Sequence, residues 1–297
     1  MSSEVTTLEL YDYQPNRGAA VFFTIIFSIV TLVQAYLLFD AFQTHNIIFV
    51  QKYTNLKLCS YTKLSLFYIP LVLGGVCEVI GFITRSISVF SKGDLNSFIA
   101  QRVCILIAPN LFMTTMYLIF GKLVQLINIS NHFIFSETVN RRLFVTGNIA
   151  GSILQGVGGG ISSDGTHADY EKGKKLIIAG LAIQLGIFVI FSLREFFLFK
   201  IIKNDGSNIA LSTQKWKLMN LVLLASGILI MVRSIVRLVE VIEGSSSPIL
   251  RHEWFSYVFD TMLMFLLMGL YAVTTPFCSL FHIQTETINF LQEDDYE

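Results

Sequence analysis

The chain has little charge for its length. Only 14% of its 297 residues are Asp, Glu, Lys or Arg, whereas a soluble domain averages about 25%. With 53% hydrophobic residues, such a chain could not cover its own surface in water, so one integral membrane domain is expected. Its formal net charge is zero, which gives no electrostatic case for a nucleic acid or a strongly acidic partner.

Proline and cysteine are also scarce. Five prolines and no low-complexity tract argue against linkers between domains. The four cysteines show neither CxxC nor zinc-type spacing. His252 and Glu253 are not followed by the second histidine of an HExxH motif, and no phosphate-binding glycine loop with its lysine is present. We therefore expect no enzymatic activity, no cofactor and no metal.

Long apolar stretches are what the chain has instead. A transmembrane helix needs about 20 mainly apolar residues. Seven stretches have about this length: Gly18–Phe39, Leu64–Thr84, Ile99–Phe120, Leu143–Ile161, Leu176–Leu193, Leu218–Leu238 and Trp254–Thr275. They predict an all-α polytopic membrane protein, a bundle of seven transmembrane helices over residues 18–280. Residues 1–17 would form an extracellular segment and residues 281–297 an acidic cytosolic tail.

An odd number of spans places the two termini on opposite sides of the membrane. Connectors 40–63, 121–142 and 194–217 hold more Lys and Arg than the alternate set of connectors. Cytosolic loops are the ones enriched in these residues. The pattern favours an N-terminus outside and a C-terminus in the cytosol. The first span is expected to be retained, because an acidic segment precedes it and no small-residue cleavage site follows it.

Charged side chains lie inside the predicted spans. Two triplets with i, i+4, i+7 spacing end the sixth span and begin the seventh: Arg233, Arg237 and Glu240, then Glu253, Tyr257 and Asp260. On an α-helix each triplet shares one face. A charge at the bilayer centre costs about 2.5–3.5 kcal/mol. We therefore predict that Arg233 or Arg237 pairs across helices with Asp260 or Glu78.

Alternation of the spans predicts that, apart from Asn148, the strongly polar residues lie in or near the same half of the bilayer, which is the outer half under the favoured orientation. The candidate site comprises eleven residues: Glu78, Arg85, Gln101, Gln155, Gln184, Arg233, Arg237, Glu240, Glu253, Tyr257 and Asp260. Some charges near helix ends could instead reach the interface, and the glutamines could join helices by hydrogen bonds. The prediction is a polar pocket beneath the connector 245–251.

Glycine is concentrated in the fourth predicted span. Gly147 and Gly151, and then Gly156 and Gly160, have the spacing of small residues at helix contacts. This spacing predicts a close approach of the fourth span to a neighbouring helix.

Seven motifs follow one another across nearly the whole membrane domain. They are YxYxPN (11–16), CEVIGFITR (77–85), IAPNLFMTTMYLIFGKL (107–123), LFVTGNIAGSILQGVGGG (143–160), IIAGLAIQ (177–184), RSIVRLVEVIEG (233–244) and HEWFSYVFD (252–260). Together they resemble the fungal lipid-translocating exporter family, seven-span proteins linked to aminocholesterol resistance. One position departs from the pattern: Asn148 stands where the family usually has Asp.

The resemblance implies a fungal plasma-membrane protein, with relatives associated with sphingoid-base export, sterol-like drug resistance and porphyrin uptake. Its partners would be membrane lipids or amphipathic small molecules, with a second copy of the chain in a homo-oligomer as a further candidate. Our leading hypothesis is a translocator of amphipathic compounds that contributes to resistance to toxic ones. The alternative is a heptahelical sensor that binds a lipid or sterol. No ATP-binding motif is present, so transport would be passive, gradient-coupled or dependent on another protein.

Overall fold

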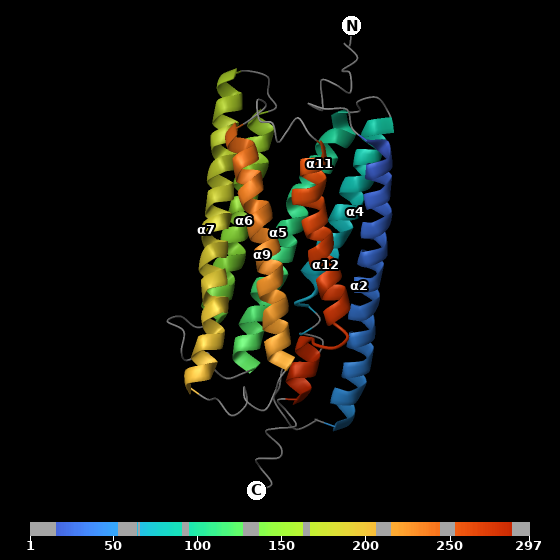
Figure 1. The fold of residues 1–297 in the computed structure, drawn as a ribbon, viewed down its shortest axis with the longest axis vertical. Helices are drawn as coiled ribbons and strands as arrows, with labels where there is room; N and C mark the ends of the chain where they lie inside the picture. The colour runs from blue at the N-terminus through green and yellow to red at the C-terminus, as the bar shows by residue number, and fades with distance from the viewer. Residues whose placement is uncertain are drawn as a thin grey trace.

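The computed structural model describes residues 16–52, 64, 66–90, 95–126, 137–162, 167–205, 215–243 and 253–286. Its helices are α2 (Arg17–Lys52), α4 (Ile69–Phe90), α5 (Leu95–Leu126), α6 (Glu137–Ser162), α7 (His167–Asp205), α9 (Lys215–Glu243), α11 (Glu253–Ser256), the π-helical turn η3 (Tyr257–Met262) and α12 (Leu263–Thr274). Helices α11, η3 and α12 follow one another as one rod. The long helices run side by side in alternating directions and form an elongated bundle (Figure 1).

The helices form a closed ring. Each packs against the next in the order α2, α4, α5, α6, α7, α9 and α12, and α12 returns to α2. Helix α5 also contacts α9 across the ring. The apolar part of α5 is 56% buried inside the protein, compared with 17% for α2. Helix α5 is therefore central and α2 is peripheral.

The outer surface of the ring is apolar. Large side chains such as Phe22, Leu32, Ile228 and Phe277 point outward, and Leu32 is 70% exposed. Exposure of such a surface to water is unfavourable, whereas contact with lipid tails is not. Six of the described helices are long and apolar enough to cross a membrane: Arg17–Ala41, Ile69–Phe90, Asn96–Leu126, Asp169–Leu198, Lys215–Glu243 and Trp254–Thr274. The chain is therefore a helical multi-pass membrane protein, as predicted.

Helix α6 contains the fourth predicted span, Leu143–Ile161, but is not among these six helices. It has 26 residues and packs between α5 and α7. Its glycines and amide side chains make it less apolar than the other long helices. By length and composition, six of the described helices can therefore cross a membrane, and the fourth predicted span is not among them.

Glycines set the contact between α6 and α7. A Cβ on Gly180 of α7 would lie 2.6 Å from the carbonyl oxygen of Gly151 on α6, so the two backbones touch. Gly147 faces the same helix, and the predicted close approach is confirmed for Gly147 and Gly151. The prediction is wrong for Gly156 and Gly160, because no atom of the described residues lies within 4 Å of a Cβ at either position.

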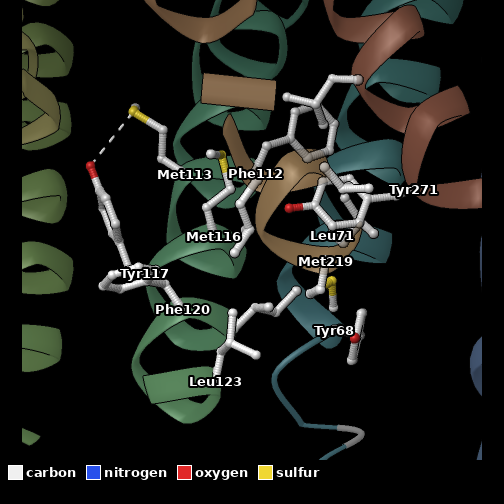
Figure 2. Close-up of a cluster of buried hydrophobic side chains, with 14 of the residues drawn as sticks. Tyr68, Leu71, Phe112, Met113, Met116, Tyr117, Phe120, Leu123, Met219 and Tyr271 are labelled. Atoms are coloured by element: carbon white, nitrogen blue, oxygen red, sulfur yellow. Dashed lines mark hydrogen bonds between the residues drawn. The ribbon is translucent and has the colours of Figure 1, made fainter. Parts of the chain in front are cut away.

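Methionine and aromatic side chains fill the interior between α4, α5, α9 and α12 (Figure 2). Phe112, Met116 and Tyr271 are all at most 1% exposed. The Tyr117 hydroxyl donates to Met113 Sδ at 3.9 Å, the dashed contact in Figure 2. Flexible methionines fill gaps between rigid rings, so this core packs densely without a regular side-chain pattern.

The segment after α12 packs against the end of the bundle at which α9 begins. Residues 280–286 are helical. Phe281 is 1% exposed, and its ring stacks on Tyr68 with centroids 6.1 Å apart. Lys215 at the start of α9 forms an ion pair of 2.6 Å with Glu286. The predicted tail 281–297 therefore begins with packed residues, and its remainder lies outside the described residues.

Candidate functional site

The site begins at an interruption in the backbone bonding of α5. Pro109 lies inside this helix. Proline has no N–H, so the carbonyl four residues earlier, that of Ile105, loses its usual donor. Inside a membrane such a carbonyl needs another partner. The Nη2 atom of Arg233 on α9 donates to it at 3.3 Å, which fastens α9 to α5 and orients the guanidinium.

The same guanidinium pairs with an acid from the last span. Nε of Arg233 forms an ion pair with Oδ1 of Asp260, and the two side chains are only 8% and 11% exposed. Arg237, one turn further along α9, places its Nε 3.8 Å from Oδ2 of Asp260. The prediction that Arg233 or Arg237 pairs across helices with Asp260 or Glu78 is confirmed.

Asp260 lies in the six-residue π-helical turn η3. Such turns hold one more residue than an α-helical turn, and they occur frequently at functional sites. The prediction that Glu253, Tyr257 and Asp260 share one face of a regular α-helix is wrong, because residues 257–262 do not follow α-helical spacing. Glu253 begins α11, and its side chain is outside the described structure.

Two further acids complete a charge cluster around this pair. Glu78 on α4 is 1% exposed and lies within electrostatic range of Asp260, Arg233 and Arg237. Arg237 is shared, because its Nη1 also pairs with Glu240 at 2.8 Å. Buried charges persist in a membrane protein when opposite charges surround them. The charge cluster, defined as these five residues, meets that condition across α4, α9 and η3.

An aromatic stack adjoins the charge cluster. The guanidinium carbon of Arg85 lies 5.0 Å from the ring centroid of Tyr257, within the range of a cation–π contact. Phe23 on α2 also stacks on that ring, at 5.1 Å and nearly parallel. Gln101, buried on α5, lies one turn before Ile105 on the same face. These contacts extend the site from α2 to α5.

The two predicted glutamines belong to a separate amide network. Gln155 donates to Gln184 at 2.6 Å, and Gln184 donates to Oδ1 of Asn110 at 3.0 Å and to Ser152 at 3.0 Å. Asn148 donates to the carbonyl of Asn110 at 2.7 Å. These bonds join α5, α6 and α7, whereas the charge cluster is built on α4, α9 and η3. The predicted single pocket is therefore two polar clusters.

Asn148 has a specific task in the amide network. Its amide nitrogen donates to the Asn110 carbonyl and, at 3.2 Å, to Oγ1 of Thr114. A carboxylate is an acceptor only and could make neither bond. Asn148 is thus a hydrogen-bond donor between α6 and α5.

Sequence reasoning missed a buried acid in the opposite half of the bundle. Glu195 is 0% exposed. The fifth span was predicted to end at Leu193, which put Glu195 in a connector, but α7 continues to Asp205. The prediction that polar residues gather in one half is therefore wrong. The signal was present, because Gln184 and Glu195 are eleven residues apart and share a helix face.

Other contacts of the site were also missed. The vacant carbonyl of Ile105 follows from Pro109 alone and was not anticipated. Gln34 on α2 donates to the carbonyl of Met268 on α12 at 2.8 Å, which helps to close the ring. The connector 245–251, predicted to cover the pocket, lies outside the described residues.

Comparison with known proteins places this arrangement in a family. The family model described as "RTA1 like protein" matches residues 71–283, a range that contains both polar clusters. The chain belongs to the RTA1-like family. Protein RTA1 of Saccharomyces cerevisiae is 34% identical over 293 residues, which cover 97% of this chain and 92% of that protein.

Two other relatives in the same yeast carry names that state an activity. "Protoporphyrin uptake protein 1" is 31% identical over 303 residues, covering 96% of this chain and 98% of its own length. "Sphingoid long-chain base transporter RSB1" is 26% identical over 252 residues, covering 73% of this chain and 64% of its own. No solved structure matches the chain. The family therefore includes proteins named for moving lipids or lipid-like compounds.

Proposed function

We propose that this RTA1-like protein moves an amphipathic lipid or lipid-like compound across the plasma membrane, and so contributes to resistance to toxic amphiphiles. The charge cluster receives the polar headgroup. Its acids suit an amine, and its arginines suit a phosphate or carboxylate. The relatives named for protoporphyrin uptake and sphingoid-base transport support this reading, since both compounds combine a polar group with a large apolar body.

The topology that we propose has seven spans, with the N-terminus outside. The 26 residues of α6 are about 39 Å long at 1.5 Å per residue, more than the roughly 30 Å of a bilayer core. Its position in the ring between α5 and α7 supports its passage through the membrane with them. The charge cluster would then lie in the outer half of the bilayer.

One observation carries the proposal: a buried acid shared by two arginines. Replacing a buried ion pair by apolar residues is often neutral or stabilising, so stability alone does not explain why the charges are there. Asp260 pairs with Arg233 and lies 3.8 Å from Arg237. One arginine can therefore turn to an anionic headgroup while the other still neutralises the acid. Charge exchange of this kind suits a site that binds and releases its ligand.

The proposal is tested by reconstituting the purified protein into lipid vesicles. Fluorescent amphiphiles with amine, phosphate or carboxylate headgroups are added, and their transfer between leaflets is measured against protein-free vesicles. We expect faster transfer of at least one class. Binding without faster transfer would identify a lipid sensor instead. If the protein neither binds nor moves any of these compounds, the proposal is wrong.

A further inference from the structure

The charge cluster does not use the buried acid in the other half of the bundle. Glu195 on α7 is completely enclosed. Neither of its carboxylate oxygens has a hydrogen-bond partner in the described part of the chain. Asp260 differs, because it has an arginine on each oxygen. A carboxylate enclosed without any donor or counter-charge is strongly unfavourable, so its presence calls for a ligand.

Three helices bring oxygen atoms to this place. A Cβ on Gly227 of α9 would lie 3.8 Å from Oε2 of Glu195, so the carboxylate lies against α9 where that helix has no side chain. Ser226 is fully buried beside this glycine. The Tyr271 hydroxyl from α12 lies next to Ser226 and within electrostatic range of Glu195. In Figure 2 this hydroxyl points into the interior of the bundle.

We propose that Glu195, Ser226 and Tyr271 form a second binding site, which takes one compact positive charge. The shared chemistry is a singly charged group held by oxygen atoms, either a monovalent metal ion or the primary ammonium of an amphiphile. Carboxylate and hydroxyl oxygens are ligands for hard cations and acceptors for ammonium N–H groups. The inference goes beyond the proposed function, because an inorganic ion would occupy the site whether or not the protein moves amphiphiles.

A proton alone explains this arrangement less well. It would neutralise Glu195, but the new O–H would itself be a buried donor that needs an acceptor. Within the described part of the chain, the hydroxyls of Ser226 and Tyr271 also lack a well-formed hydrogen bond. A cation between the three side chains satisfies all of these oxygens together.

Polar groups continue from this site toward the nearer end of the bundle. Asn220, two turns from Gly227 on the same face of α9, is fully buried, and neither atom of its amide has a hydrogen-bond partner in the described structure. Tyr271 is in electrostatic range of Tyr68. The Tyr68 side chain lines a cavity of about 10 Å³ between α2 and the segment after α12, which has room for about one water molecule. Asn220 and Tyr68 therefore place further polar groups on the side of the site that faces this end of the bundle.

The test is thermal unfolding of the purified protein in detergent at constant ionic strength. N-methylglucamine chloride is replaced stepwise by sodium, potassium or hexylammonium chloride, with hexanol as the uncharged control for the last. We expect at least one cation to raise the unfolding midpoint by several degrees in the wild type. The same rise is expected in Glu243→Gln, which alters an exposed acid at the end of α9, and it should be absent in Glu195→Gln.

The separate titrations distinguish an inorganic ion from the ammonium headgroup of an amphiphile. A rise with sodium or potassium identifies an inorganic ion, and a rise with hexylammonium alone identifies a headgroup. Equal rises in Glu195→Gln, no rise with any cation, or a midpoint that follows pH but not cations would each overturn the proposal. If Glu195→Gln does not fold, Ser226→Ala and Tyr271→Phe replace it. Each of these two substitutions should increase the cation concentration that gives half of the rise in midpoint. If this concentration is unchanged in both variants, the proposal is also overturned.

Discussion

Arg233 of α9 makes an ion pair with Asp260 in η3 and also donates to the backbone of α5 at Ile105. One guanidinium thus joins three elements of the site: α9, η3 and α5. Its position depends on Pro109, which removes the competing donor inside α5. A proline, an arginine and an aspartate far apart in the chain therefore act as one structural unit.

The ion pair should dominate the stability of the charge cluster. Asp260→Asn leaves Arg233 buried without its main counter-charge, and breaking such a pair costs about 3–5 kcal/mol. We expect a loss of this size in the free energy of unfolding, measured by chemical denaturation in detergent. Glu240→Gln is the matched control, because its pair with Arg237 is about twice as exposed and should cost about 1 kcal/mol or less. Equal losses would contradict the assignment.

Pro109 should matter for transport more than for stability. Pro109→Ala returns an N–H to α5, which can then bond the Ile105 carbonyl and release Arg233 from it. We expect slower amphiphile transfer in vesicles with an unchanged or higher unfolding midpoint. Pro70→Ala is the control, because Pro70 lies in the first turn of α4, where no intrahelical bond is gained. Full transfer by Pro109→Ala would show that the vacant carbonyl has no role.

The π turn should position Tyr257 independently of Asp260. Deleting Val258, a 44% exposed residue of η3, allows a regular α-helix and rotates the residues before it by about 100°. Tyr257 would then leave Phe23 and Arg85, while Asp260 keeps its register with α12. We expect transfer to fall, with a stability loss of about 1–2 kcal/mol from the lost ring contacts. Val258→Ala, which keeps the turn, should behave as wild type; full transfer by the deletion variant would contradict this role.

Close contact between α6 and α7 should depend on particular glycines. A leucine at position 180 would overlap the carbonyl of Gly151, and overpacking of this kind costs about 1–3 kcal/mol. Gly180→Leu should lower the unfolding midpoint measurably. Gly156→Leu, at a position where no described residue places an atom within 4 Å of a Cβ, should not. A similar effect of both substitutions would place the contact elsewhere.

Outside the spans, His282 should make stability depend on pH. Burial, followed by the charge of Lys215, lowers the pKa of His282 below its usual value, while Glu286 acts in the opposite direction. A histidine whose pKa is lowered on folding binds its proton more readily when unfolded, so stability falls as the pH drops below about 6.5 and is constant above it. We expect the unfolding midpoint to fall less in His282→Gln than in the wild type when the pH is lowered from 7.5 to 5. Identical slopes in both proteins would exclude the effect.

The sequence was sufficient for the parts of the fold that depend on composition. Long apolar stretches predicted the helices, and the spacing of charges predicted that Arg233 or Arg237 would meet an acid from another span. These predictions succeed because the bilayer forces apolar length and charge pairing on any spanning helix. Composition identifies helix α6 as a span less clearly, because the glycines that allow its contact with α7 also reduce its hydropathy.

The remaining features depend on contacts that no local pattern records. A π turn follows from how η3 packs against α9, so regular spacing misplaced Tyr257 relative to Asp260. Gln155 and Gln184 were assigned to the charge cluster by depth, and depth does not distinguish the α6–α7 side of α5 from the α9 side. Glu195 was overlooked because Arg194 and the lysines after it indicated a connector, whereas α7 continues through them to Asp205.

The most direct test of the account is leaflet transfer by Glu78→Gln and Asp260→Asn in vesicles that contain equal amounts of folded protein. The amphiphile is the one that the wild type moves fastest, and Glu243→Gln, which alters an exposed acid outside the charge cluster, is the control. We predict that both variants lose at least about tenfold in initial rate, the effect of about 1.4 kcal/mol on headgroup binding, while the control keeps its rate. Wild-type rates in both variants would contradict the claim that the charge cluster carries the headgroup.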